Sequence, residues 1–89
     1  MNFDNPPPGT VVDDPRNGEH MTGIVTLWWG HRGYGFILPE GRNEKVFFHW
    51  KSLVDARAVK TAEVGDRVQF TYRRTDKGAA AMDVIIVAK

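Results

Sequence analysis

Aromatic side chains recur at every second position in two short stretches of the chain, RGYGFI at residues 32–37 and VFFHW at residues 46–50. Successive side chains of a β-strand point to opposite faces, so this spacing gathers rings on one face of each strand. Flat rings stack on flat ligands, and unstacked nucleobases are ligands of that kind. The pattern therefore indicates noncovalent binding by stacking.

A hairpin turn at residues 39–43 would pair these two stretches and combine their faces. The residues expected on the shared surface are Tyr34, Phe36, Phe47 and His49. The residues expected in the core beneath them are Ile37, Val46 and Phe48.

The alternative is that both faces are buried and that the rings simply belong to the core. A small barrel already has enough other apolar residues to fill its interior. The expected core consists of Ile24, Val25, Ile37, Val46, Phe48, Val68, Phe70, Val84 and Ile86. Since little would remain to cover a second face, we expect the rings to be open to solvent and to a ligand.

Glycine and basic residues accompany the rings. Gly33 and Gly35 lack side chains, which would let a ribose or the backbone approach and the strand bend. The basic residues expected at the edges, where they could meet phosphates, are Arg32, Arg42, Lys45 and Lys51.

The composition excludes several other functions. The chain has no cysteine, and its three histidines are scattered, so neither a disulfide framework nor a metal site is expected. Ser52 has no histidine at a triad spacing, and no close carboxylate pair suggests hydrolase chemistry. We therefore expect no enzyme activity, no cofactor and no small-molecule substrate.

The strands that must position the rings fall in the second part of the chain. Residues 1–20 hold four of the five prolines, and their four acidic residues and one arginine give a net charge of −3. Because the whole chain has a net charge of +1, residues 21–89 have a net charge of +4. We predict that residues 1–20 form a disordered, proline-rich acidic tail and that residues 21–89 form one domain. A signal peptide and a membrane segment are not expected, so we predict a soluble, cytoplasmic protein. We expect it to be a monomer, although no motif of the sequence addresses the oligomeric state.

Short apolar or alternating runs within residues 21–89 predict an all-β barrel. The expected strands are residues 23–29, 33–38, 45–49, 68–74 and 80–87. Residues 75–78 are expected to form a second hairpin loop, and residues 52–60 a turn and loop with at most one or two helical turns.

Residues 32–37 resemble the first ribonucleoprotein motif, with Ile37 in the place of valine. The motif comes too early in the domain for an RNA-recognition motif fold, whereas a cold-shock domain fits. Residues 21–25, 46–50, 65–70 and 77–84 also resemble that family's strand motifs. The resemblance implies a five-stranded antiparallel barrel of the oligonucleotide-binding class that binds single-stranded RNA or DNA, as an RNA chaperone or a regulator of gene expression.

The resemblance also implies which residues bind. They are Tyr34, Phe36, Phe47, His49 and Trp50 as stacking groups and Arg32 as the basic residue. Beyond the resemblance, we expect Lys51 at the edge, and Trp28 and Trp29 of the first strand, to belong to the same site. The family's usual Lys-Trp-Phe-Asn is replaced here by residues 26–29, TLWW, so Leu27 stands where the first stacking Trp would be.

Two readings of this departure are open. A slight shift of the strand could give the stacking role to Trp28 or Trp29, which we favour, or one base site is lost. Residues 54–64 also lack the aromatic that often forms an outer platform in the family. A protein-interaction barrel that uses the same aromatic patch is the alternative function.

Overall fold

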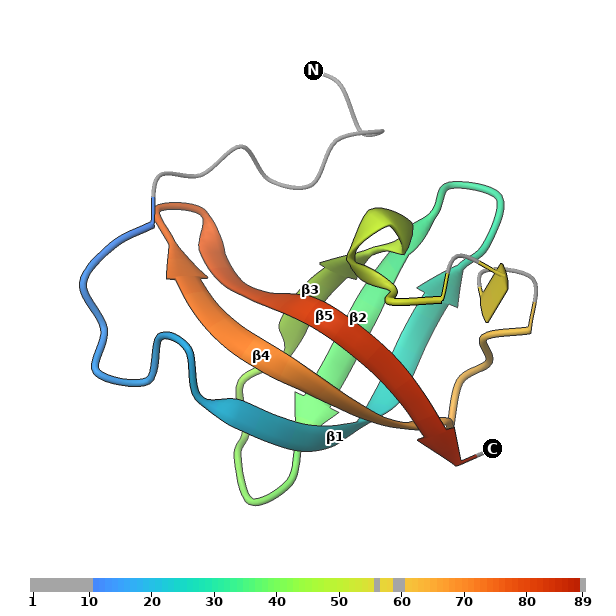
Figure 1. Cartoon of the computed structure of the whole chain (residues 1–89), viewed down its shortest axis with the longest axis horizontal. Helices are drawn as coiled ribbons and strands as arrows, with labels where there is room; N and C mark the ends of the chain where they lie inside the picture. The colour runs from blue at the N-terminus through green and yellow to red at the C-terminus, as the bar shows by residue number, and fades with distance from the viewer. Residues whose placement is uncertain (1–10, 56, 59–60, 89) are drawn as a thin grey trace.

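The computed structural model describes residues 11–55, 57, 58 and 61–88, and these form a closed five-stranded barrel (Figure 1). The strands run in the order β1-β2-β3-β5-β4 around the barrel, which confirms the predicted architecture. Their ends lie within three residues of the predicted ends. The elements are β1 (His20–Trp29), β2 (Tyr34–Pro39), β3 (Val46–His49), the 3₁₀ turn η1 (Trp50–Ser52), β4 (Arg67–Thr75) and β5 (Gly78–Ala88).

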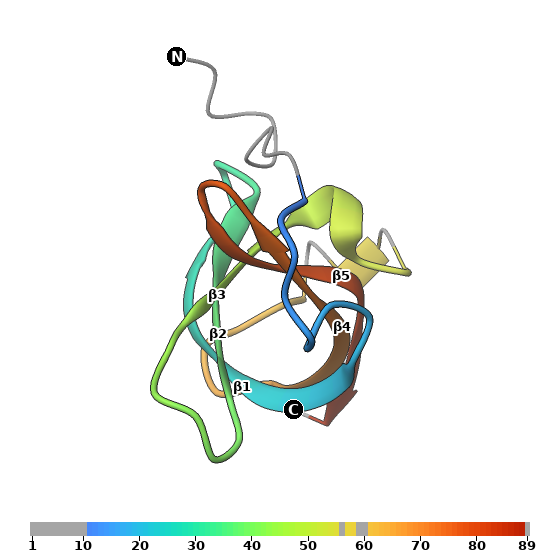
Figure 2. The same ribbon diagram turned by 90° about the vertical axis from the view of Figure 1, so that its left-hand side faces the viewer.

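Antiparallel strand pairs build most of the barrel, and one parallel contact between β3 and β5 closes it. The pairs β1–β2, β2–β3, β1–β4 and β4–β5 are antiparallel. Strand β5 meets β3 in parallel, with Phe47 opposite Ala80. In Figure 1 the β4–β5 hairpin lies across the sheet of β1, β2 and β3, and the turned view in Figure 2 shows β1 curving around the interior.

The interior is filled by the apolar residues that alternate along these strands. Of the predicted core, Ile24 is only half-buried and Ile86 packs at the margin, while the other seven residues are fully buried. The core also includes residues that the prediction omitted, namely Met21, Leu53, Tyr72, Ala79 and Ala81. Its main members agree with the prediction because strand alternation alone selects them.

The described segment after β3 begins with the 3₁₀ turn η1, and residues 57 and 58 are also in 3₁₀ conformation. Leu53 forms an isolated bridge with Val84 of β5, and the Val54 N–H donates to the Val84 carbonyl. Residues 56, 59 and 60 of the helical candidate lie outside the described residues. Within the described part of the chain, no helix is long and apolar enough to cross a membrane.

The predicted tail divides at residue 10. Residues 1–10 lie outside the described residues, whereas residues 11–19 run beside β4 and His20 opens β1. The Val12 N–H donates to the Arg74 carbonyl, and Tyr72 exchanges backbone hydrogen bonds with Gly18 and Glu19. The structure therefore differs from the prediction over residues 11–20, because backbone groups of β4 supply partners that composition does not reveal.

Candidate nucleic-acid interface

The register of β2 and β3 brings the predicted rings to the outside of the barrel. Tyr34 lies opposite His49, and Phe36 lies opposite Phe47. Tyr34, Phe36 and Phe47 are half-buried, so they are not sealed inside the core. The Phe47 ring centroid lies 5.7 Å from that of Tyr34 and 5.9 Å from that of Phe36. These three rings therefore form one continuous surface.

A β-bulge at Thr26 decides which residues of β1 join this surface. Val25 pairs with Ile37 and Leu27 pairs with Phe36, so Thr26 is the extra residue. Its hydroxyl lies 3.4 Å from the Phe36 carbonyl, as a donor to it. A one-residue bulge reverses the faces of the side chains that follow it. Leu27 consequently faces outward beside Phe36.

The same bulge settles the positions of the two tryptophans. Trp29 pairs with Tyr34, is 37% exposed, and has its ring centroid 5.1 Å from that of Tyr34. Trp29 thus extends the row of rings. We call the surface made by Leu27, Trp29, Tyr34, Phe36 and Phe47 the aromatic face.

Trp28, a predicted binding residue, lies elsewhere. It stacks on Phe48, with ring centroids 5.2 Å apart and planes inclined by 11°, and it packs against the core. Trp28 therefore belongs to the packing of the barrel, because the bulge turns it inward.

His49 also differs from its predicted role as an open stacking group. Its side chain is 1% exposed, although its register places it opposite Tyr34. His49 Nδ1 accepts a hydrogen bond of 3.2 Å from the Lys51 N–H at the start of η1. The ring lies 5.8 Å from that of Trp50. His49 thus positions the turn that carries Trp50 and Lys51.

The two glycines of the motif are needed by the protein itself. Gly33 has a φ of +78°, which favours glycine, and a Cβ there would collide with the Trp50 ring. A Cβ on Gly35 would collide with the Leu27 carbonyl oxygen of β1. The space beside these glycines is therefore filled by Trp50 and by β1, rather than left for a ribose.

An open pocket of about 440 Å³ lies next to the aromatic face, at the turn between β1 and β2. Arg32, His49, Trp50 and Lys51 are among the residues that line it. Trp50 is 38% exposed, and Lys51 Nζ lies 6.0 Å from the Trp50 ring centroid. Exposed Arg32 and Lys51 place two positive charges beside exposed ring surface.

Five arginines away from this pocket pair with carboxylates. Arg42 pairs with Glu19 at 3.1 Å, so this predicted edge residue is engaged within the protein. The Glu44 carboxylate, 2.7 Å from Arg74, raises the pKa of that guanidinium. In the described part of the chain, no cluster of three or more His, Cys, Asp or Glu side chains could hold a metal ion.

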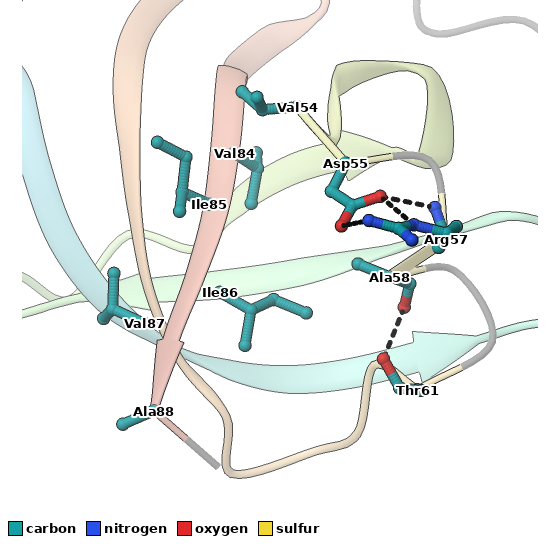
Figure 3. Close-up of a pocket in the computed structure, with 10 residues that line it drawn as sticks. All are labelled: Val54, Asp55, Arg57, Ala58, Thr61, Val84, Ile85, Ile86, Val87 and Ala88. Carbon is teal, nitrogen blue, oxygen red and sulfur yellow. Dashed lines mark hydrogen bonds and ion pairs between the residues drawn. The ribbon is translucent and has the colours of Figure 1, made fainter.

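A second concave surface has a different character. A groove of about 850 Å³ lies between the end of β5 and the segment after η1, and we call it the β5 groove (Figure 3). Val54, Ile85 and Val87 supply exposed aliphatic side chains. At its rim Arg57 is held by the Asp55 carboxylate, as the dashed lines in Figure 3 show. None of the described residues that line the groove is aromatic.

Comparison with known proteins agrees with this barrel and its sequence motifs. Residues 21–87 match the model of the 'Cold-shock' DNA-binding domain. The chain is 34% identical over 65 residues to the cold shock-like protein CspB of Yersinia pestis, covering 73% of this chain and 91% of that protein. It is 38% identical over 66 residues to the cold shock-like protein CspA of Vibrio cholerae, covering 74% and 93%.

A solved structure supports the same fold. The Drosophila Unr CSD456 structure superimposes with a TM-score of 0.61 at 21% sequence identity. The match covers 79% of this chain and 27% of that one.

Proposed function

The chain belongs to the cold-shock DNA-binding domain family, whose fold binds nucleic acids, and from that premise we propose that it binds single-stranded RNA or DNA with little dependence on base sequence. Bases stack on the aromatic face, while Arg32 and Lys51 meet phosphates at its edge. Stacking does not sense the 2′-hydroxyl, so the proposal covers both nucleic acids.

The observation that carries this proposal is the row of rings Trp29–Tyr34–Phe47–Phe36 on the outside of the barrel. Each stacked base contributes about 1–3 kcal/mol to binding in proteins of this type. Three or four stacked bases therefore dominate the affinity. Sequence tolerance follows, because every base has a flat face.

The charges beside the rings support a polyanionic ligand. Arg32 and Lys51 are both exposed and have no carboxylate partner among the described residues. Two cations at the end of a row of rings suit a phosphate backbone that continues past the stacked bases. In the cell, such a domain acts as an RNA chaperone or as a regulator of gene expression, by keeping strands unpaired.

The test is a fluorescence titration of the whole chain with oligothymidylate of six or seven bases. Quenching of tryptophan emission should saturate at micromolar concentrations in low salt, because Trp29 and Trp50 lie beside the binding surface. A duplex of the same length should bind far more weakly, since its base faces are hidden. Absence of quenching and of any mobility change with the single strand would refute the proposal.

Salt dependence separates this function from a protein-interaction barrel that uses the same rings. Single-strand binding should weaken with added salt at a slope of about −0.7 per phosphate neutralised. An apolar contact with a protein releases few ions, so its affinity should hardly change.

A further inference from the structure

The arginines of this chain fall into two groups by the partners they have. Five of the seven form ion pairs with carboxylates at 2.6–3.2 Å; they are Arg16, Arg42, Arg57, Arg67 and Arg74. Among the described residues no carboxylate pairs with the other two, Arg32 and Arg73. Arg32 lies beside the aromatic face, and Arg73 lies on β4.

Arg73 lies in the same cross-strand row as Phe47. In the barrel Phe47 of β3 is opposite Ala80 of β5, and Ala80 is opposite Arg73 of β4. Residues that oppose each other across a sheet direct their side chains to the same face. Tyr72, the neighbour of Arg73, is 1% exposed and points into the core, so Arg73 points outward. The row therefore runs over the outer surface.

The spacing of this row suits an extended strand of nucleic acid. Neighbouring strands lie about 4.8 Å apart, so Phe47 and Arg73, two strands apart, are separated by about 10 Å of sheet. Ala80, which lies between them, has only a methyl side chain, so no long side chain separates Phe47 from Arg73 along this row. Ala80 itself is 9% exposed.

The guanidinium of Arg73 has an unmet hydrogen-bond donor. Its Nε is buried, with no hydrogen-bond partner among the described residues. A buried donor on a charged group is costly unless an acceptor meets it. A phosphate on the outer surface would meet the terminal NH₂ groups of this guanidinium rather than its buried Nε. The fork of an arginine matches the oxygens of a phosphate, which can accept two parallel hydrogen bonds.

We propose that Arg73 is a phosphate-binding residue and that the bound strand continues from Phe47 across Ala80 onto β4. This inference rests on the proposed function, and it extends the binding surface beyond the three strands that carry the rings. The ligand class is the phosphodiester backbone of single-stranded RNA or DNA.

The test compares Arg73→Met with Arg67→Met in oligothymidylate titrations at several salt concentrations. Both substitutions keep an unbranched stem and remove one positive charge. Both residues alternate along β4 with the buried Val68, Phe70 and Tyr72, so they lie on its outer face. Arg67 is a matched control because it pairs with Glu40 at 2.6 Å and lies at the opposite end of the strand.

Arg73→Met should lower the affinity about 3- to 10-fold in low salt and make the salt slope shallower by about 0.7, the value for one phosphate. Arg67→Met should leave the slope unchanged. Thermal unfolding of Arg73→Met should occur at the same or a higher temperature, since the variant removes an unmet buried donor. A residue with a purely structural role would instead lower the unfolding temperature and leave the slope unchanged.

Arg73→Lys provides a second variant that keeps the charge without the fork. It should retain the salt slope and lose only part of the affinity. Equal slopes for wild type and Arg73→Met, or equal effects of Arg73→Met and Arg67→Met, would overturn the inference.

Phe47→Ala distinguishes this failure from a failure of the proposed function. If wild type binds and Phe47→Ala weakens binding while Arg73→Met does not change the slope, only the role of Arg73 is wrong. If wild type does not bind oligothymidylate, the function and the inference fail together.

Discussion

The aromatic face and the β5 groove are both apolar surfaces of one small barrel, but they suit different ligands. The aromatic face presents flat rings whose centroids lie 5.1–5.9 Å apart. The β5 groove presents branched aliphatic side chains, with Ile85 and Val87 each 45% exposed (Figure 3). A base stacks on a ring face, whereas a branched side chain offers it no comparable plane.

Charge separates the two surfaces further. Arg57 at the β5 groove is engaged by Asp55, whereas Arg32 beside the aromatic face has no carboxylate partner in the described residues. An exposed ion pair contributes little to stability, but it cancels the charge that a phosphate would need. The two surfaces therefore share apolar exposure and differ in two features, since only the aromatic face combines flat rings with a neighbouring cation that has no carboxylate partner among the described residues.

The largest expected effect is a difference in the free energy of unfolding between variants of Trp28, which packs on the core, and Trp29, which lies on the aromatic face. Trp28→Ala should lower the free energy of unfolding by about 3 kcal/mol, because it removes a ring stacked on buried Phe48. Trp29→Ala should lower it by only about 1 kcal/mol, the scale of one aromatic pair, and should weaken binding instead. Denaturant unfolding and oligothymidylate titration of both variants measure this. Equal losses of stability would contradict the assignment of the two rings to opposite faces.

The next largest effect is a change in single-strand affinity, which we expect from substitutions in the aromatic face but not from one in the β5 groove. Phe47→Ala should weaken single-strand binding by about 1–3 kcal/mol, with the barrel still folded, because Phe47 lies at the centre of the row of rings. Phe36→Ala should act in the same way. Ile85→Ala in the β5 groove is the matched control and should leave affinity unchanged. A fall in affinity with Ile85→Ala would mean that the groove also binds; unfolding of Phe47→Ala would assign that ring to the core.

A smaller gain of affinity should follow from enlarging the aromatic face. Leu27→Trp should strengthen binding by about 1 kcal/mol, since Leu27 lies opposite Phe36 on this surface and lacks a ring. Fluorescence or calorimetric titration measures the change. Unchanged or weaker affinity would show that Trp29 already occupies the space available to the base.

The smallest effect concerns the segment before β1. A hydrogen bond from the Arg16 side chain lowers the pKa of Asp14 to about 2, from 3.8. The lowered value means that ionised Asp14 stabilises the folded state fully above about pH 4, and that this contribution is lost as the pH falls toward 2. Asp14→Asn should remove this pH dependence. Two-dimensional NMR of residues 11–19 across that range, in both proteins, would detect it; identical titrations would contradict the pairing.

Much of the fold could be predicted from the sequence because it depends on local patterns. The alternation in residues 34–37 and 46–48 separates Tyr34, Phe36 and Phe47 from Ile37, Val46 and Phe48, and a two-residue period needs only the strand itself. The hairpin between them brings the two faces into register. Five strands, their approximate ends and the core followed from the same reasoning.

The positions that differed depend on contacts between distant segments. The bulge at Thr26 turns Trp28 inward and Trp29 outward, and no local signal in TLWW distinguishes the two. His49 is buried because Tyr34 lies opposite it and the turn at Trp50 adjoins it. Residues 11–19 gain partners from β4, which lies some fifty residues later.

The sequence by itself therefore determined that this protein is a β-barrel with rings alternating along two neighbouring strands, because side-chain alternation is a property of each strand alone. The tertiary structure decided which rings reach solvent and which cations stand beside them. It did so through one bulge, one parallel contact between β3 and β5, and the pairing of carboxylates with all but two arginines among the described residues. These features depend on contacts between segments that are far apart in the chain, so a local sequence pattern does not predict them.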